Sequence, residues 1–201
     1  MSNILIVNAS PRRGGNIDRV LNLVEERLRR GGDVDVQLVR VDELSVRPCR
    51  ACMACRKTGR CTMTPEDDGH RFAELLREAD CLIIGAPTYW ANIPGPLKTL
   101  LDRCVATLID TSAPSRLLPR PLCKGKRAVL LTASTTPWPW NSLAGQSSGC
   151  LKALKSILRP AGYRIRSAAI PGTCKQPPSD TTVTKTADRI VRFLRSMYGR
   201  I

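Results

Sequence analysis

The 201-residue sequence has few histidines, few aromatic residues and few acids. It contains one histidine, three Trp, three Tyr and two Phe, and it has 17 acidic residues against 32 Lys and Arg. A lone histidine argues against a Ser-His-Asp mechanism. The shortage of acids leaves a formal net charge of +15, which predicts an anionic partner such as nucleic acid, an acidic protein or a phosphorylated cofactor.

Long apolar runs are also missing from the sequence. No segment approaches the roughly 20 consecutive apolar residues of a membrane-spanning helix. The apolar start at residues 3–9 is short, follows no basic region and meets Pro11-Arg12-Arg13. We therefore expect neither a membrane span nor a secretion signal, and a cytoplasmic location. The nine cysteines, an odd number without a signal sequence, argue against a disulfide framework and predict reduced, metal-ligating or buried thiols.

The apolar residues that are present suffice for one hydrophobic core. They make up 42% of the chain, which argues against a disordered protein, and about 200 residues suit a single core. We expect one domain over residues 1–201, with a cysteine-rich loop at residues 46–69.

Short apolar runs alternate with segments of helical spacing. Three continuous runs are typical of parallel strands buried on both faces, namely residues 4–7, 81–85 and 128–132. Residues 34–39 alternate like an edge strand, and residues 165–170 form a weaker fifth strand. Helical spacing occupies residues 17–31, 72–76, 97–108, 151–158 and 187–197. This order predicts an α/β fold, a three-layer sandwich whose five-stranded parallel sheet has the order 2-1-3-4-5 with helices on both faces. In such a sheet a ligand binds beyond the carboxyl ends of the first and third strands.

The first of the expected ligand loops, residues 8–16, has the composition of a phosphate site. It offers the Ser10 hydroxyl, the guanidinium groups of Arg12 and Arg13, glycines that let backbone amides converge, and the amino end of a helix. The patterns GxGxxG and GxxxxGK[ST] are absent, which disfavours a dinucleotide-binding fold and a Mg-NTP enzyme. The competing interpretation is a basic surface turn capped by Asn16.

Four of the few aromatic residues fall in two short loops. Tyr89 and Trp90 follow the third strand, and Trp138 and Trp140 follow the fourth. We expect them to enclose or stack on a flat ring, although caps on the core or contacts between subunits are the alternatives. A phosphate in the first loop and a flat ring at the other two describe a mononucleotide, for which flavin mononucleotide (FMN) is the natural candidate.

Three segments resemble the NAD(P)H-dependent FMN reductases of the flavodoxin-like superfamily: NASPRRGGN at residues 8–16, APTYW at 86–90 and PLKTLLDR at 96–103. Within this group CRACMAC at residues 49–55, followed by Gly59-Arg60-Cys61 and Asp67-Asp68, resembles the iron-sulfur flavoproteins. The likeness covers residues 1–110 and is faint beyond. It implies a flavodoxin-like fold, bound FMN, NAD(P)H as co-substrate, and a homodimer or homotetramer with flavin near subunit contacts.

The resemblance also implies cofactor contacts at matched positions. Those expected at the phosphate are Ser10, Arg12 and Asn16, and those lining the isoalloxazine ring are Pro87, Thr88, Tyr89, Trp90 and Asn92. Ser134 and Trp138, after the fourth strand, complete the expected set. Ile17 stands where these proteins often have threonine, so a hydroxyl is missing and the Ile17 backbone amide serves the phosphate instead.

Four cysteines, Cys49, Cys52, Cys55 and Cys61, follow the spacing C-x2-C-x2-C-x5-C. This spacing lets one short loop wrap a [4Fe-4S] cluster through four thiolates. A zinc site usually has two CxxC pairs separated by a longer segment, so we rank zinc below iron-sulfur. A thiol loop without any cluster is the other alternative.

The remaining cysteines and the histidine are expected in structural positions or are assigned no role. Cys81 and Cys104 occupy apolar positions and are expected in the core. Cys123, Cys150 and Cys174 are assigned no role. His70 follows Asp67-Asp68-Gly69 at a helix start, where capping or surface exposure is expected rather than catalysis.

Three functions follow from these features. In the first, FMN accepts hydride from NAD(P)H and passes electrons to a quinone, another small acceptor or the cluster, and no side chain is needed as catalytic acid or base. In the second, the protein is an electron carrier fed by an acidic, ferredoxin-like donor. The third is a basic nucleic-acid-binding protein, which we rank last because the sequence has no recognition helix and no aromatics spread along a groove.

Overall fold

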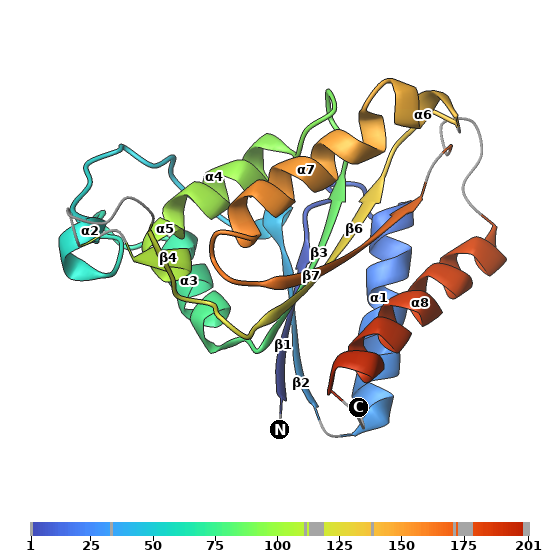
Figure 1. Ribbon diagram of the computed structural model, residues 1–201, viewed down its shortest axis with the longest axis horizontal. Helices are drawn as coiled ribbons and strands as arrows, with labels where there is room; N and C mark the ends of the chain where they lie inside the picture. The colour runs from blue at the N-terminus through green and yellow to red at the C-terminus, as the bar shows by residue number, and fades with distance from the viewer. Residues whose placement is uncertain are drawn as a thin grey trace.

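The computed structural model describes residues 2–32, 34–110, 112, 119–137, 139–170, 172 and 179–198. Trp138 and Cys174 lie outside the described residues. Five parallel strands form the central sheet in the order β2-β1-β3-β6-β7 (Figure 1). Their bounds are β1 Ser2–Asn8, β2 Val34–Arg40, β3 Cys81–Pro87, β6 Arg127–Ala133 and β7 Arg164–Ile170. Counted along the main sheet this is the order 2-1-3-4-5, so the predicted fold class is confirmed.

Two layers of helices cover the sheet. Helices α1 (Asn16–Gly31) and α8 (Asp180–Tyr198) lie side by side on one face (Figure 1). The opposite face is covered by α3 (Asp68–Glu78), α4 (Gly95–Arg103), α5 (Val105–Leu108) and α7 (Gln146–Leu158). Short elements complete the chain: η1 Val41–Glu43, α2 Cys55–Thr58, α6 Trp140–Leu143, and the antiparallel pair β4 Ile109–Asp110 and β5 Arg120–Pro121.

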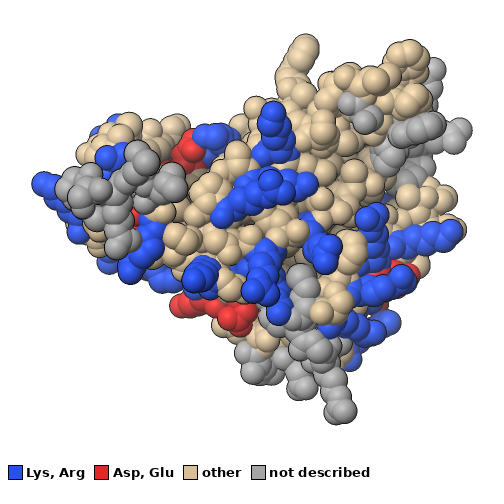
Figure 2. Space-filling view, in the orientation of Figure 1, with Lys and Arg blue, Asp and Glu red and all other residues tan. Residues whose placement is uncertain are grey.

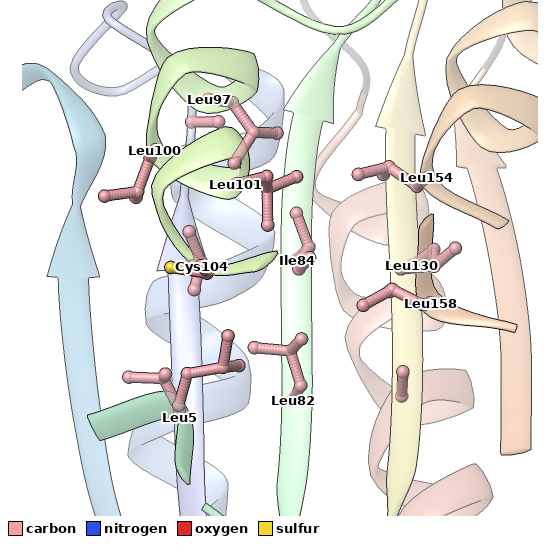
Figure 3. Close-up of a cluster of buried hydrophobic side chains, with 14 of the residues drawn as sticks. Leu5, Leu82, Ile84, Leu97, Leu100, Leu101, Cys104, Leu130, Leu154 and Leu158 are labelled. Carbon is pink, nitrogen blue, oxygen red and sulfur yellow. The ribbon is translucent and has the colours of Figure 1, made fainter. Parts of the chain in front are cut away.

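The core between α4 and the sheet is made of leucine-rich faces. Leu97 and Leu101 of α4 lie over Ile84 of β3, and Leu154 of α7 lies near Leu130 of β6 (Figure 3). Each is almost fully buried, and burying a leucine side chain contributes roughly 1.5–3 kcal/mol. These contacts set the position of α4 on the sheet.

One sequence-based expectation for this layer is wrong. The spacing of Leu97, Leu101 and Leu108 predicted a single helix, but the helix ends at Arg103 and α5 begins at Val105. The chain turns at Cys104, whose amide donates to the Leu101 carbonyl over three residues rather than four. The apolar periodicity survives the break because both short helices pack on the same core.

The two cysteines expected in the core are there. Cys81 and Cys104 are fully buried, which confirms the prediction, and Cys123 and Cys150 are buried as well. Burial raises the pKa of Cys104 to about 12. These four cysteines are therefore packing groups of the core, whereas the thiols of the cysteine-rich loop are exposed or half-buried.

Candidate functional site

Three loops are tied to one another at the carboxyl edge of the sheet. The Ala9 amide donates to the Gly85 carbonyl at 2.8 Å, and the Thr88 amide donates to Ala133 at 2.9 Å. The Ser134 amide donates to the Ile170 carbonyl at 3.2 Å. The loops that follow β1, β3 and β6 therefore meet at the edge where the sheet order places a ligand.

The first loop presents unpaired helix amides. Helix α1 begins at Asn16, and its N-cap is Gly15, which has no side chain to cap it. Asn16 therefore does not cap the helix, and the amides of its first turn have no acceptor within the helix. Ser10 is buried and Arg12 is exposed, whereas the Ile17 side chain packs against Gly85 in the core. The Ile17 side chain is therefore part of the core, and the phosphate contact expected of its backbone amide stays a prediction.

Glycine at position 85 permits this arrangement. A Cβ atom there would lie 2.6 Å from Cγ2 of Ile17 and 2.7 Å from Cδ1 of Leu21. Any larger side chain would therefore push α1 away from β3. The glycine brings the amino end of α1 close to the carboxyl end of β3.

A buried ion pair that the sequence did not indicate holds the first loop. The Asp18 carboxylate accepts hydrogen bonds from Asn8 Nδ2 at 2.7 Å, from the Gly14 amide at 2.8 Å and from Arg40 Nη1. Arg40 Nη2 also donates to the Ser10 carbonyl at 3.0 Å. Both charged side chains are 9% exposed. One feature of the sequence is related to this ion pair. Arg40 is the last residue of β2, the strand paired with β1, and it lies opposite Asn8.

The loop after β3 makes a tight turn with left-handed residues. Tyr89 and Asn92 exchange backbone hydrogen bonds at 3.0 and 2.9 Å, and the two residues between them, Trp90 and Ala91, have φ angles of 51° and 56°. Such angles are unusual for bulky residues and tend to be kept where they serve function. Thr88 Oγ1 lies 3.0 Å from Thr132 Oγ1, which joins this loop to β6.

The aromatic side chains of these loops point outward. Trp90 is 99% exposed, Tyr89 is 47% exposed and Trp140 is 63% exposed. The interpretation that they cap the core is therefore wrong for these three residues. The expected contacts with a flat ring or with a second subunit stay predictions.

Helix α7 packs against the turn formed by Tyr89, Trp90, Ala91 and Asn92. A Cβ atom on Gly149 would lie 1.9 Å from the Ala91 carbonyl oxygen, so the helix contacts the turn through a glycine. Ser134 is buried beside α7, with its Oγ 3.3 Å from Ser147 Oγ. Asn92 is exposed, and its side-chain oxygen accepts the Ile93 amide at 2.8 Å. Pro87 ends β3 and is half-buried.

The four spaced cysteines share one loop at the opposite end of α4. Cys49 and Cys52 are exposed, and Cys55 and Cys61 are half-buried. Burial raises the pKa of Cys55, and the neighbouring Cys61, Cys52 and Cys49 raise it further, so the four sulfurs are within electrostatic reach of one another. In the described part of the chain, however, no three Cys, His, Asp or Glu side chains are arranged to hold a metal ion.

The donor set of this loop nevertheless suits a cluster. The Ala51 amide donates to Cys49 Sγ at 3.4 Å, and Arg103 Nε donates to Cys61 Sγ at 3.3 Å. Ala51 and Met53, which lie between the cysteines, have left-handed φ angles that curl the chain. Soft thiolates with N–H donors to sulfur are the ligands that iron-sulfur clusters take.

Both ends of the loop are anchored at Asp67. This residue is the N-cap of α3 and forms a capping box with His70, whose Nδ1 accepts the Asp67 amide at 3.1 Å. The expected capping role of His70 is confirmed, although its side chain is buried rather than exposed. Arg103 binds the Asp67 carboxylate at 2.8 and 3.1 Å, and the Arg47 amide donates to it at 3.1 Å.

This ion pair predicts a pH dependence of stability. Burial alone would raise the pKa of Asp67, but hydrogen bonds from Arg103 and Arg47 outweigh burial and hold it well below the usual range. A depressed folded pKa gives stabilisation that is complete above the unfolded pKa of about 3.9 and is lost as the pH falls through the folded pKa. We therefore expect the free energy of unfolding in urea to fall more steeply below about pH 4 for the native sequence than for Asp67→Asn. Parallel pH profiles for the two proteins would contradict this assignment.

Comparisons with known proteins agree with the fold. The profile of a family described as NADPH-dependent FMN reductase matches residues 2–165. An iron-sulfur flavoprotein of Methanosarcina thermophila is 37% identical over 100 residues, which cover 49% of this chain and 50% of that protein. One from Archaeoglobus fulgidus is 28% identical over 166 residues, which cover 81% of this chain and 67% of that protein. The chain thus spans about half the length of several curated relatives that it matches.

Solved structures show the same architecture at low identity. An azoreductase from Bacillus anthracis str. Sterne has a TM-score of 0.73 at 16% identity, and the match covers 96% of this chain and 98% of that one. An NAD(P)H:quinone oxidoreductase from Methanothermobacter marburgensis has a TM-score of 0.70 at 17% identity, covering 100% and 98%. A B. anthracis str. Ames Ancestor FMN-dependent NADH-azoreductase in complex with FMN has a TM-score of 0.67 at 19% identity, covering 98% of each chain. Among the described residues, no helix has the length and apolarity to cross a membrane.

Proposed function

The chain belongs to the NADPH-dependent FMN reductase family, and from this we propose that it binds FMN at the carboxyl edge of its sheet and transfers electrons from NAD(P)H. The observation that carries the proposal is the pairing of two loops at this edge. The uncapped amino end of α1 lies beside Ser10 and Arg12, and the left-handed turn at Trp90 follows the adjacent strand.

The protein's own groups bind and orient the cofactor. We assign the phosphate to Ser10, Arg12, Asn16 and the Ile17 amide, and the ring to the loop at Pro87, Thr88, Tyr89, Trp90 and Asn92. Ser134 and Trp138 complete the proposed set. When bound, FMN supplies hydride and single-electron chemistry, so no side chain of this site has to act as an acid or a base.

We propose that the cysteine-rich loop holds a [4Fe-4S] cluster through Cys49, Cys52, Cys55 and Cys61. The four free thiols, the N–H donors to two of the sulfurs and the names of the related iron-sulfur flavoproteins support this proposal. Arg47, Arg50, Arg56, Lys57 and Arg60 of the same loop would offset the negative charge of the thiolates.

The outward aromatic side chains support a further proposal, that two or four copies of the chain assemble. Trp90, Trp140 and Leu143 are each more than half exposed, and such residues are typical of subunit contacts. A second copy at this edge would cover the flavin ring. The electrons then pass to a quinone or another small acceptor that reaches the flavin at this edge of the sheet.

The test is to purify the protein anaerobically, measure FMN and iron per chain, and titrate it with NADH and NADPH. We expect one FMN per chain, about four irons per cluster, and bleaching of the flavin absorbance by at least one of the two pyridine nucleotides. Flavin that stays oxidised at saturating NADH and NADPH would refute the reductase. A protein that takes up no FMN on reconstitution would refute the phosphate-loop assignment.

A second function, electron transfer with an acidic redox protein, is favoured by one stretch of sequence. Between Asp110 and Asp180 there is no acidic residue, yet there are eleven Lys and Arg. Among them, Lys152 of α7, Arg159 directly after it, and Arg164 and Arg166 of β7 are exposed. Figure 2 shows Lys and Arg spread over this region. In the same anaerobic titration, salt-sensitive reduction by a ferredoxin without any response to NAD(P)H would select the carrier.

A further inference from the structure

Arg103 is the most completely engaged cation that the structure describes near the cysteines. Its side chain is 0% exposed. Nη1 donates to Asp67 Oδ2 at 2.8 Å and to the Arg47 carbonyl at 2.9 Å, and Nη2 donates to Asp67 Oδ1 at 3.1 Å. The remaining donor, Nε, points to Cys61 Sγ at 3.3 Å. The guanidinium therefore has one fixed orientation and one sulfur contact.

The contacts of Arg103 join distant parts of the molecule. Arg47 and Asp67 lie at the two ends of the cysteine-rich loop, and Cys61 is the last of its four spaced thiols. Arg103 itself is the last residue of α4, which begins at Gly95, directly after the turn that we assign to the flavin ring. Nine helical residues span about 13 Å. One rigid helix thus links the proposed flavin loop to the proposed cluster loop.

We propose that Arg103 is a positioning residue for electron transfer: its Nε–H group holds the Cys61 sulfur as the fourth ligand and sets the reduction potential of the cluster. The inference rests on the cluster proposed above. Reduction adds one electron and no bond, and the added negative charge falls partly on the sulfurs. An N–H donor and a buried positive charge stabilise that charge, so they make the potential more positive.

A purely structural role is the competing explanation. The ion pair of Arg103 with Asp67 closes the loop whether or not a cluster is present, and that role alone predicts a change in stability. Truncating Arg103 by itself would also leave the Asp67 carboxylate buried and unpaired, which destabilises proteins strongly. A test must therefore remove the sulfur donor in a protein that no longer carries the Asp67 carboxylate.

The experiment compares Asp67→Asn with the double variant Asp67→Asn/Arg103→Met. The single variant breaks the ion pair but keeps the Nε donor, and the double variant removes both charges and the donor. Redox titration of the reconstituted proteins gives the midpoint potentials of the iron centre and the flavin separately, and EDTA challenge gives iron retention. Arg71→Met, which removes an exposed cation of the neighbouring helix α3, is the matched control.

We expect the iron centre of the double variant to have a more negative potential than that of Asp67→Asn, with an unchanged flavin potential. Iron retention is expected to fall by roughly 10- to 100-fold, as for other groups that contact a metal ligand. Equal iron potentials in the two variants, or the same shift in Arg71→Met, would overturn the inference even if stability differs. A native protein that reconstitutes no iron but is bleached by NAD(P)H would overturn the cluster and this inference together and leave the flavin reductase intact.

Discussion

Replacing Arg40 with methionine is expected to lower the free energy of unfolding by roughly 3–5 kcal/mol, because it leaves a buried charge without its partner. The Asp18 carboxylate is 9% exposed and would keep only its bonds from Asn8 and the Gly14 amide. Arg40→Met also removes the hydrogen bond from Arg40 to the Ser10 carbonyl of the phosphate loop, so we expect FMN affinity to fall by about tenfold or more. Urea unfolding and fluorimetric FMN titration measure the two effects.

Two further variants separate charge burial from loss of packing. Arg40→Met/Asp18→Asn removes both charges and is expected to recover most of the lost stability, since a matched neutral pair carries no uncompensated buried charge. Arg13→Met removes an exposed arginine of the same loop, which pairs with Glu43 at 2.5 Å, and is expected to change stability little. If Arg40→Met is as stable as Arg13→Met, the ion pair does not hold the loop.

Gly149→Ala is expected to destabilise the protein, although an alanine inside a helix usually stabilises by about 0.5–1 kcal/mol relative to glycine. The new methyl group would lie 1.9 Å from the Ala91 carbonyl oxygen, a backbone atom, so α7 or the turn has to move. Overpacking of this kind costs about 1–3 kcal/mol. Because the displaced turn carries Tyr89 and Trp90, FMN should bind more weakly as well. Thermal unfolding and flavin titration report both changes.

Gly95→Ala is the matched control for this substitution. Gly95 is the first residue of α4, close in sequence to the same turn, and a Cβ atom there would have no heavy atom within 4 Å. We expect Gly95→Ala to be neutral or slightly stabilising, with unchanged FMN affinity. The same rise in thermal midpoint for both variants would show that α7 does not support the turn.

The sheet was predictable because apolar runs report burial directly. The continuous runs in β1, β3 and β6 and the alternation in β2 are local patterns, and they fix both the strands and their order. The loops that follow these strands were predictable for the same reason. Their composition is local, and the sheet order brings them to one edge.

The ion pairs that hold the candidate site were not predictable. Asp18 and Arg40 are 22 residues apart, and Asp67 and Arg103 are 36 residues apart. The sequence has 32 basic residues, and nothing in the residues next to Arg40 or Arg103 shows that these two are buried. Their burial depends on acidic partners that are distant in the sequence. The left-handed turn at Trp90 was not predictable either, because Trp90 and Ala91 are residue types that seldom adopt positive φ angles.

The packing of α1 against α8 has a consequence for the order in which the protein folds. Arg19 and Arg27 of α1 form ion pairs with Asp180 and Asp188, partners 161 positions away. The apolar side of α1 lies in the same cluster as Val183, Ile190 and Leu194 of α8. During synthesis α1 packs first on β1, β2 and β3, whereas its contact with α8 forms only after α8 has left the ribosome. This part of the layer therefore depends on slow, long-range closure.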